Sequence, residues 1–342
     1  MKKGLFSTPM LRSFWMSASL TPLRLKMYMI GTLAAVIAVS TLFFAIILSL
    51  LRALNILVLA SLVAVFNVAQ WLLAPYLIEA VYQVREVKPE ENPRLHGMVD
   101  RLARKSGLPK PKVMLANIPI PNAFAYGSPL TGYKVAVTRG LLNTLEDDEV
   151  EAVLGHELGH IKHRDVQIMM IASFLPSIFY MIGRSFLISA YYGPVERGRE
   201  GEAASPQLIG ALSIGMYFLL TLIVLGLSRL REYYADFHSA SVVENGATKL
   251  SEALAKIVYS TGRMRMRYGS ALAFSGFKPL FITDPDRSET DIVEMSTYAR
   301  YRDKALVERL LRRRLTFIDH LMELFSTHPN IVKRIRALQA YA

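Results

Sequence analysis

The feature that most limits the fold of this chain is a long apolar region near its start. From Met27 to Ile78 the only charged residue is Arg52, which divides the region into two uncharged stretches, 27–51 and 53–78. Each is longer than the roughly 20 residues that an α-helix needs to cross a bilayer. Because a single charged residue separates them, the sequence predicts a tight transmembrane helical hairpin.

Two further apolar stretches lie in the second half of the chain. Residues 166–183 have about the minimum length for a span, and residues 208–228 are comfortably long. A polar connection, 191–206, separates them. We expect both to cross the membrane, with partial burial against a soluble domain as the alternative. The sequence therefore predicts four transmembrane helices.

Basic residues set the expected orientation. Five of them and no acidic residue precede the first span: Lys2, Lys3, Arg12, Arg24 and Lys26. The positive-inside rule places this end in the cytoplasm. We expect a multi-pass protein of the plasma membrane with five parts. These are a cytosolic basic segment (1–26), a transmembrane hairpin (27–78), a cytosolic part (79–165), a second transmembrane pair (166–228) and another cytosolic part (229–342).

Composition agrees with this arrangement. The formal net charge is +12, and cationic groups beside a membrane favour anionic lipid, so we expect membrane lipids and not nucleic acid as partners. The chain has no cysteine, which excludes disulfides. The first apolar stretch is too long for a cleavable signal peptide, and no small-residue cleavage site follows it.

The motif H-E-L-G-H at 156–160 carries the chemistry. His156 and His160 are four residues apart, so on a helix both imidazoles reach one metal ion. Glu157 lies one step round, where its carboxylate can hold a water that the metal acidifies. This is the pattern of a zinc peptidase. Because shuffled chains show it about once in a hundred tries, the assignment depends on its surroundings.

A helix is expected around the motif. Thr144 and the acidic run 146–149 are typical of an N-cap and a first helical turn. Gly155 and Gly159 each weaken a helix by about 1 kcal/mol relative to Ala, which predicts the close approach of another element or of substrate. His163 lies about 10.5 Å along the helix from His156, too far for one ion to bind both. We expect His163 to be solvated or at the membrane interface.

A third ligand must come from another element. Glu232 and Asp236 are four apart just after the last apolar stretch, so a second helix can point both carboxylates at the first. Glu232 can bind zinc, and Asp236 can accept the outer N–H of a ligating histidine. The alternative is a charged helix end just outside the membrane, with Arg231 and Glu232 solvated. The H-E-x-x-H motif favours the ligand interpretation.

The segment between the hairpin and the motif is expected to fold as a small unit. Residues 92–104 have helical periodicity, and 113–115 and 134–138 are typical of short strands. Between the two strands, four residues could form an exposed sheet edge that binds an extended substrate by main-chain hydrogen bonds: Asn122, Ala123, Phe124 and Ala125. The alternative is an ordinary hairpin strand.

An ordered set of motifs resembles the HtpX-type membrane zinc metallopeptidases of the M48 group, relatives of the CAAX prenyl protease Ste24. The resemblance runs from about residue 80 to 338. Its motifs are N-A-F-A-Y-G at 122–127, V-A-V-T-R-G-L-L at 135–142, H-E-L-G-H-I-K-H-R-D at 156–165, S-R-L-R-E-Y-Y-A-D at 228–236 and S-T-H-P-N-I-V-K-R-I at 326–335. The family usually has Thr where this chain has Tyr126, so we expect a different pocket beside the cleft.

The resemblance implies a mainly α integral membrane protein with four transmembrane helices. It also implies a cytosolic α+β gluzincin-like zinc peptidase domain with a small β-sheet. One Zn²⁺ per chain would be bound by His156, His160 and Glu232, with Asp236 supporting a ligand. Glu157 would act as general base and then general acid.

The implied function is that of a quality-control endopeptidase, which hydrolyses peptide bonds of misfolded or damaged membrane proteins by zinc-activated water. A donor beside the zinc would help to stabilise the oxyanion, and the sequence does not choose among Tyr233, Tyr234 and His328. No oligomeric state is predicted.

Three alternatives remain. A CAAX-type processing peptidase uses the same chemistry, but that relative has seven spans around a large chamber. A site-2-type intramembrane protease carries its motif inside an apolar span, whereas this motif follows the acidic run 146–149. A catalytically inactive, zinc-stabilised membrane scaffold would not need Glu157, and its metal site would usually be closed by a fourth ligand.

The remaining polar features are expected to be structural. His96, His238 and His320 are predicted to be surface or satisfied structural histidines. The run from Arg312 to Arg314 is interpreted as a solvated helix face, with a lipid-facing basic cluster as the alternative. The insert at 263–315 shows no motif, and we hypothesise that it covers the cleft.

Overall fold

The computed structural model describes residues 56–192, 205–268, 282 and 303–341. The predicted cytosolic segment 1–26 and the predicted span 27–51 lie outside these residues. So does most of the insert at 263–315, on which the cleft-covering hypothesis depends.

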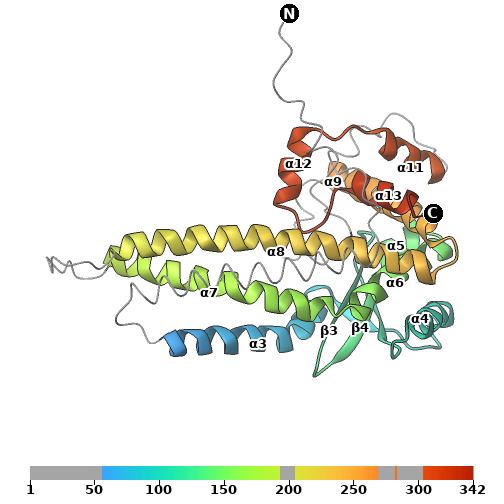
Figure 1. The fold of residues 1–342 in the computed structure, drawn as a ribbon. Coiled ribbons are helices and arrows are strands. Elements are labelled where there is room, and N and C mark those ends of the chain that lie inside the picture. The colour runs from blue at the N-terminus through green and yellow to red at the C-terminus, as the bar shows by residue number, and fades with distance from the viewer. Residues whose placement is uncertain (1–55, 193–204, 269–281, 283–302, 342) are drawn as a thin grey trace, which may run out of the picture.

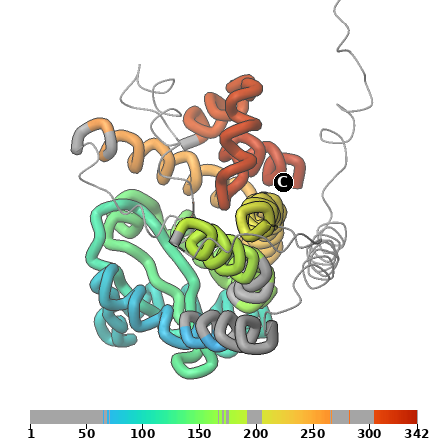
Figure 2. The backbone as a smooth tube through the Cα atoms, turned by 90° about the vertical axis from the view of Figure 1, so that its left-hand side faces the viewer, coloured from blue at the N-terminus to red at the C-terminus, as the bar shows by residue number. Residues whose placement is uncertain are grey.

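Three long helices lie side by side and form one half of the molecule (Figure 1). They are α3 (Ile56–Val81), α7 (Asp165–Tyr192) and α8 (Pro206–Val242). Figure 2 shows this half from its end. α7 and α8 pack closely at Gly183 and Gly210, because a Cβ on Gly183 would lie 2.8 Å from Ile214 and one on Gly210 would lie 2.8 Å from Leu187. Small residues at such positions let two apolar helices approach in a membrane.

Within the described residues, α8 is the one helix that is both long and apolar enough to cross a membrane. Its 37 residues extend over about 55 Å, against about 30 Å for the hydrocarbon core. The predicted span 208–228 takes up the first part, and the same helix continues past Glu232 and Asp236. The sequence prediction of a span is therefore supported at α8 and stays a prediction for the other three.

A small mixed sheet lies beside these helices, in the order β1-β2-β4-β3. Its strands are β1 (Val84–Glu86), β2 (Lys112–Ala116), β3 (Ala123–Ser128) and β4 (Gly132–Thr138). β2 and β4 are parallel, with Lys112 opposite Lys134, and the other pairs are antiparallel. The two predicted strands are confirmed. The motif at 122–127 supplies most of β3, which lies at the sheet edge and forms a hairpin with β4.

Each face of the sheet is covered by helices, as the alternation of side chains requires. On one face Val113, Val135 and Val137 join the main core with residues of α4 (Pro93–Ser106) and α6 (Asp147–Lys162). On the other face Met114, Phe124, Tyr126 and Ala136 pack with Ile78 and Tyr82 at the end of α3. The sheet therefore joins the helix that carries the motif to a helix of the apolar half.

α6 surrounds the H-E-L-G-H motif, as predicted, but it begins differently. Thr144 was predicted as its N-cap, and this is wrong: Thr144 ends the short helix α5 (Arg139–Thr144), where its hydroxyl donates to Gly140 O. The N-cap of α6 is Glu146, whose backbone N–H donates to the Glu149 carboxylate at 2.8 Å. The acidic first turn is present and complements the helix dipole.

Above α6 and α8 the described residues form four C-terminal helices (Figure 1). They are α9 (Gly246–Tyr268), α11 (Asp303–Arg312), α12 (Phe317–Leu324) and α13 (Ile331–Gln339). α9 and α13 contribute fully buried side chains to the main core, among them Leu250, Leu254, Val332 and Ile335. α13 packs against α8 and α9, and α9 in turn packs against the helix that carries the motif.

The closest approach that positions the site is between α6 and α8. A Cβ on Gly155 would lie 3.0 Å from Val243 Cγ2, and a Cβ on Gly159 would lie 3.0 Å from Ala235 Cα. The two glycines thus lie where another element comes close, as the sequence predicted. Ser239 on α8 also donates to Ala152 O on α6 at 2.6 Å.

Replacing Gly159 by Ala is expected to lower the melting temperature of the detergent-purified protein. The new methyl group must push α8 away because the nearest atom belongs to backbone, and such overpacking typically costs about 1–3 kcal/mol. Gly215→Ala on α8 is the matched control, since nothing lies within 4 Å of the added Cβ. An unchanged melting temperature in Gly159→Ala would contradict the close packing.

α8 also contacts α4, through the partly buried His238. His238 Nε2 lies 2.9 Å from Ser106 Oγ. Burial, helped by the neighbouring His163 and Lys162, lowers the pKa of His238 to about 4. His238 is therefore a satisfied structural histidine, as the sequence predicted.

His238 makes stability depend on pH in a defined direction. The unfolded chain takes up a proton at this histidine near pH 6.5 and the folded chain only near pH 4, so stability is lost as pH falls between these values. The loss from this group is about 1–2 kcal/mol at pH 5. In metal-free protein the melting temperature of His238→Gln should fall less than that of the wild type between pH 7.5 and 5. Variant His320→Gln, at an exposed position, should keep the wild-type slope. Equal slopes in all three proteins would refute the effect.

Candidate active site and metal centre

Three side chains from α6 and α8 converge on one point. His156 Nε2 and His160 Nε2 are 3.2 Å apart. Glu232 brings its Oε2 to 3.7 Å from His156 Nε2 and its Oε1 to 3.6 Å from His160 Nε2. Four ligands at about 2.1 Å from a tetrahedral zinc lie about 3.4 Å from one another, so these separations fit one zinc ion.

The tautomers of the two histidines also fit a cation. His156 Nδ1 lies 2.9 Å from Asp236 Oδ1, and His160 Nδ1 lies 2.6 Å from Asp165 Oδ2. Since a carboxylate accepts hydrogen bonds, a neutral imidazole beside it is favoured to carry its proton on Nδ1 and to offer the Nε2 lone pair. Two lone pairs that face each other at 3.2 Å repel, and a bound cation removes the repulsion. Glu232 Oε2, buried, accepts no hydrogen bond from the described residues.

The charges around this point also favour a dication. Four buried carboxylates surround it: Glu157, Asp165, Glu232 and Asp236. The cations paired with them are the guanidinium groups of Arg231 and Arg334. Within the described residues this leaves two uncompensated negative charges when all four carboxylates are ionised. Buried charges are stable only when they are paired or bind a metal.

Glu157 lies next to His156 on α6 and is buried. Burial raises the pKa of Glu157 above its usual range, and the negative charge of Glu232 adds to this, while His160 and His156 oppose it. Its carboxylate accepts a hydrogen bond from the backbone N–H of Ala125 on β3. A carboxylate whose pKa is raised in this way is suited to accept and return a proton.

Asp165 was not assigned a role from the sequence, although it ends the motif at 156–165. The helix is broken before it by Arg164, which has a φ of 55°. Asp165 then starts α7 and turns back toward His160, and Arg231 Nε lies 3.1 Å from its carboxylate. Burial opposes ionisation of Asp165, but Arg231 and His160 outweigh it and lower the pKa of this carboxyl. Each histidine of the pair is therefore oriented by its own carboxylate.

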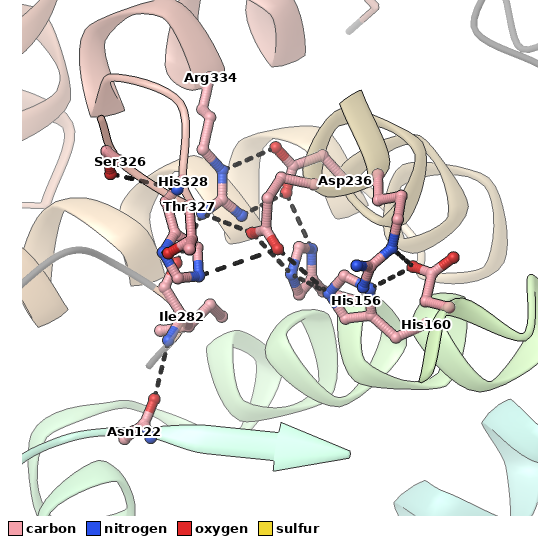
Figure 3. A network of polar contacts seen from close by, with 12 residues as sticks. Asn122, His156, His160, Asp236, Ile282, Ser326, Thr327, His328 and Arg334 are labelled. Atoms are coloured by element: carbon pink, nitrogen blue, oxygen red, sulfur yellow. Dashed lines mark hydrogen bonds and ion pairs between the residues drawn. The ribbon is translucent and has the colours of Figure 1, made fainter. Parts of the chain in front are cut away.

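Arg334 on α13 was also missed, although it lies in the motif at 326–335. It is buried and binds Asp236 with two bonds, from Nε at 2.9 Å and from Nη2 at 2.7 Å. Its Nη1 lies 3.3 Å from Glu232 Oε2 and donates to Ile282 O at 2.6 Å. Figure 3 shows Arg334 reaching down to Asp236 beside His156. Its guanidinium holds the pKa of Asp236 below its usual range, against the effect of burial.

The predicted strand lies at the sheet edge, but its side chains are mostly buried. Ala123 and Phe124 are buried beside α3 and α6, and Ala125 is half buried. Asn122 is fully buried, and its Oδ1 accepts a hydrogen bond from Ile282 N at 2.9 Å (Figure 3). Tyr126, where the family usually has Thr, is buried, and its hydroxyl donates to Glu79 of α3 at 3.1 Å. A role of this strand in substrate binding stays a prediction.

The candidate oxyanion donors lie at different places. His328 is buried, with its Nε2 3.9 Å from Glu232 Oε1 and its Nδ1 2.9 Å from Thr327 Oγ1. Tyr234 instead packs edge-on against His163, with 3.9 Å between ring centroids. Tyr233 is enclosed near Glu323 and Asp236, and burial strongly raises its pKa. His328 is thus the candidate whose contact with the site is direct.

Two other histidines lie away from the convergence point. His163 is the C-cap of α6 and half buried, and the described group able to hold a metal consists of His156, His160 and Glu232 without it. His96 Nε2 lies 2.8 Å from Val87 O, a structural contact.

The chain is similar to known proteins over most of its length. The chain is 37% identical over 289 residues to a protein named Protease HtpX homolog from Thermoplasma acidophilum, covering 83% of this chain and 85% of that protein. It is 41% identical over 275 residues to a Protease HtpX homolog from Aeropyrum pernix, covering 80% of this chain and 82% of the relative.

The fold also resembles a solved structure. The crystal structure of S. mikatae Ste24p superposes with a TM-score of 0.51 at 19% identity, over 92% of this chain and 65% of that one. This chain therefore spans less than two thirds of that longer chain, and the likeness concerns the fold alone.

A sequence model of Peptidase family M48 matches residues 89–342, a range that holds both histidines, Glu157, Glu232 and Arg334. The match covers most of the chain, and the two Protease HtpX homologs align with this chain over 85% and 82% of their own length. The convergence of two imidazoles and a carboxylate beside a buried glutamate is thus that of a metalloprotease, and the chain belongs to peptidase family M48.

Proposed function

We propose that this metalloprotease is a zinc-dependent endopeptidase of the plasma membrane that cleaves misfolded or damaged membrane proteins. The observation that carries the proposal is the convergence of His156 Nε2, His160 Nε2 and Glu232 beside the buried Glu157. These three residues would hold one Zn²⁺ per chain. When bound, zinc supplies a Lewis acid that acidifies water and polarises the scissile carbonyl.

Glu157 supplies the proton transfers. Its carboxylate accepts a proton from the attacking water and delivers it to the amine that leaves. Burial raises the pKa of Glu157 and so favours the first transfer. Asp236 and Asp165 fix the two histidines with Nε2 unprotonated. His328, which keeps a proton on Nε2 when Thr327 donates to Nδ1, is the proposed donor to the developing oxyanion.

The membrane topology is part of the proposal. Four spans, with a gluzincin-like peptidase domain on the cytoplasmic side, are supported by the apolar length of α8 and by the basic N-terminal segment. α8 brings Glu232 out directly after the stretch 208–228, so the site lies just beneath the bilayer. This position favours substrates that are themselves membrane proteins. A CAAX-type processing peptidase and a zinc-stabilised scaffold remain the alternatives.

Variant Glu157→Gln is expected to bind zinc at one equivalent and to cleave an unfolded protein about 10²–10⁴-fold more slowly than the wild type. The amide has nearly the shape of the carboxylate but cannot take a proton. The measurement compares both detergent-purified proteins with zinc. Equal cleavage by the two would indicate a contaminating protease. If neither cleaves while both bind zinc, the processing enzyme or the scaffold is favoured.

Replacing Arg334 by Met is expected to lower the free energy of unfolding by about 3–5 kcal/mol, because it leaves the Asp236 carboxylate buried without a cation. The His156 imidazole then loses its fixed orientation, so zinc should bind more weakly as well. Arg336→Met on the same helix is the control, because Arg336 is exposed and donates to the backbone carbonyls of Leu311 and Arg313. Thermal melting and zinc titration of both variants provide the comparison; two equally stable variants would exclude the proposed role of Arg334.

A further inference from the structure

Helix α12 has its polar and apolar faces reversed. Its acidic residues, Asp319 and Glu323, are buried against the protein. Asp319 accepts from Arg313 at 3.0 Å and from Thr316 N at 2.8 Å. Glu323 accepts from Asn330 N at 3.0 Å and pairs with Lys333 of α13. The face that a soluble helix would turn to water is thus turned inward.

The opposite face of α12 is apolar and exposed. Its residues recur at the spacing of one helical face and leave a continuous patch: Phe317 (79% exposed), Ile318 (65%), Leu321, Met322 and Phe325 (65%). An exposed apolar patch of this kind marks a surface that contacts a partner or a membrane.

The position of α12 favours the membrane. Arg229 follows the apolar stretch 208–228 directly, and its Nη1 donates to Glu323 O at 2.8 Å, Leu324 O at 3.2 Å and Ser326 O at 2.8 Å. The C-terminal end of α12 is therefore fixed where α8 leaves its apolar stretch. Figure 1 shows α12 standing across the axis of α8. A helix across a membrane-spanning helix lies parallel to the bilayer surface.

The direction of the apolar face agrees with this position. Glu323 points toward α13, which lies on the right of α12 in Figure 1, whereas the apolar part of α8 extends to the left. The apolar face of α12 is thus turned toward the apolar half of the molecule.

We propose that α12 is an interfacial helix that inserts its apolar face into the lipid surface beside α8. Arg312 and Arg314, exposed just before the helix, then lie at the level of anionic lipid headgroups. The inference rests on the proposed crossing of the membrane by α8. Anionic lipid explains why Arg229 holds α12 at the end of the apolar stretch of α8, and why exposed basic residues flank the helix. A second copy of this chain, with its net charge of +12, would repel those basic residues.

Single-cysteine labels test this directly, because the chain has no cysteine of its own. An environment-sensitive fluorophore is placed in the full chain by Ile318→Cys on α12. Phe218→Cys, exposed on α8 inside the predicted span, and Glu90→Cys, exposed before α4, are the references. Each protein is reconstituted into phosphatidylcholine vesicles with and without phosphatidylserine. Quenching is measured with spin-labelled lipids and with aqueous iodide.

We expect the Ile318 label to be quenched by spin-labelled lipid and shielded from iodide, with its depth about 5–10 Å below the headgroup boundary. The Phe218 label should lie deeper, and the Glu90 label should respond to iodide alone. Phosphatidylserine should strengthen lipid quenching at Ile318, and replacing Arg312 and Arg314 by Gln should remove that increase.

Three outcomes would overturn the inference in distinguishable ways. Lipid quenching at Phe218 but iodide quenching at Ile318 would mean that α8 crosses and α12 faces water. Iodide quenching at both would mean that α8 does not cross, and the proposed topology would fail with the inference. Shielding of Ile318 from both quenchers would mean that protein covers the face, from a second copy or from another segment.

Discussion

Two helices far apart in the sequence, α6 and α8, approach at Gly155 and Gly159 until a side chain of either glycine would strike the other helix. The contacts that join the two histidines to Glu232 and Asp236 are made across this junction. The ligand atoms lie within 4.8 Å of one another, and a shift of a few tenths of an ångström between the helices alters the distances from Glu232 to both imidazoles. The close packing is therefore a condition for the site and not only for stability.

Around this junction each imidazole is surrounded first by a carboxylate and then by an arginine. Each imidazole is bound to a carboxylate, and each of these carboxylates is bound to an arginine: Arg334 for Asp236 and Arg231 for Asp165. The outer arginines keep the carboxylates ionised in spite of their burial, and ionised carboxylates keep the proton on Nδ1. In this way α13, near the end of the chain, helps to decide which nitrogen of His156 faces the metal position.

Much of this centre could be predicted because its spacing is local. Two histidines four apart, and two carboxylates four apart, each define one helix face without any knowledge of the tertiary fold. Asp165 and Arg334 stand inside recognised motifs, yet their roles depend on contacts between elements. Arg334 meets Asp236 across 98 positions, and no periodicity encodes such a pair. The Thr144 cap was wrong because a short separate helix, α5, uses that residue. The burial of the β3 side chains could not be predicted from their small size, since burial depends on which helices lie over the strand.

Because α8 runs without a break from its apolar stretch to Glu232, the chain cannot accept insertions in between. Ser228 and Glu232 belong to one helix without an internal proline, so a residue inserted between them would turn Glu232 by about 100° and move it by about 1.5 Å along the axis. Either displacement takes the carboxylate away from the two imidazoles. Loops accept insertions because they can bulge outward, but this short stretch of helix cannot. We therefore expect active relatives to keep the length of this stretch, and to adjust to a thicker or thinner membrane at the Pro206 end of the helix.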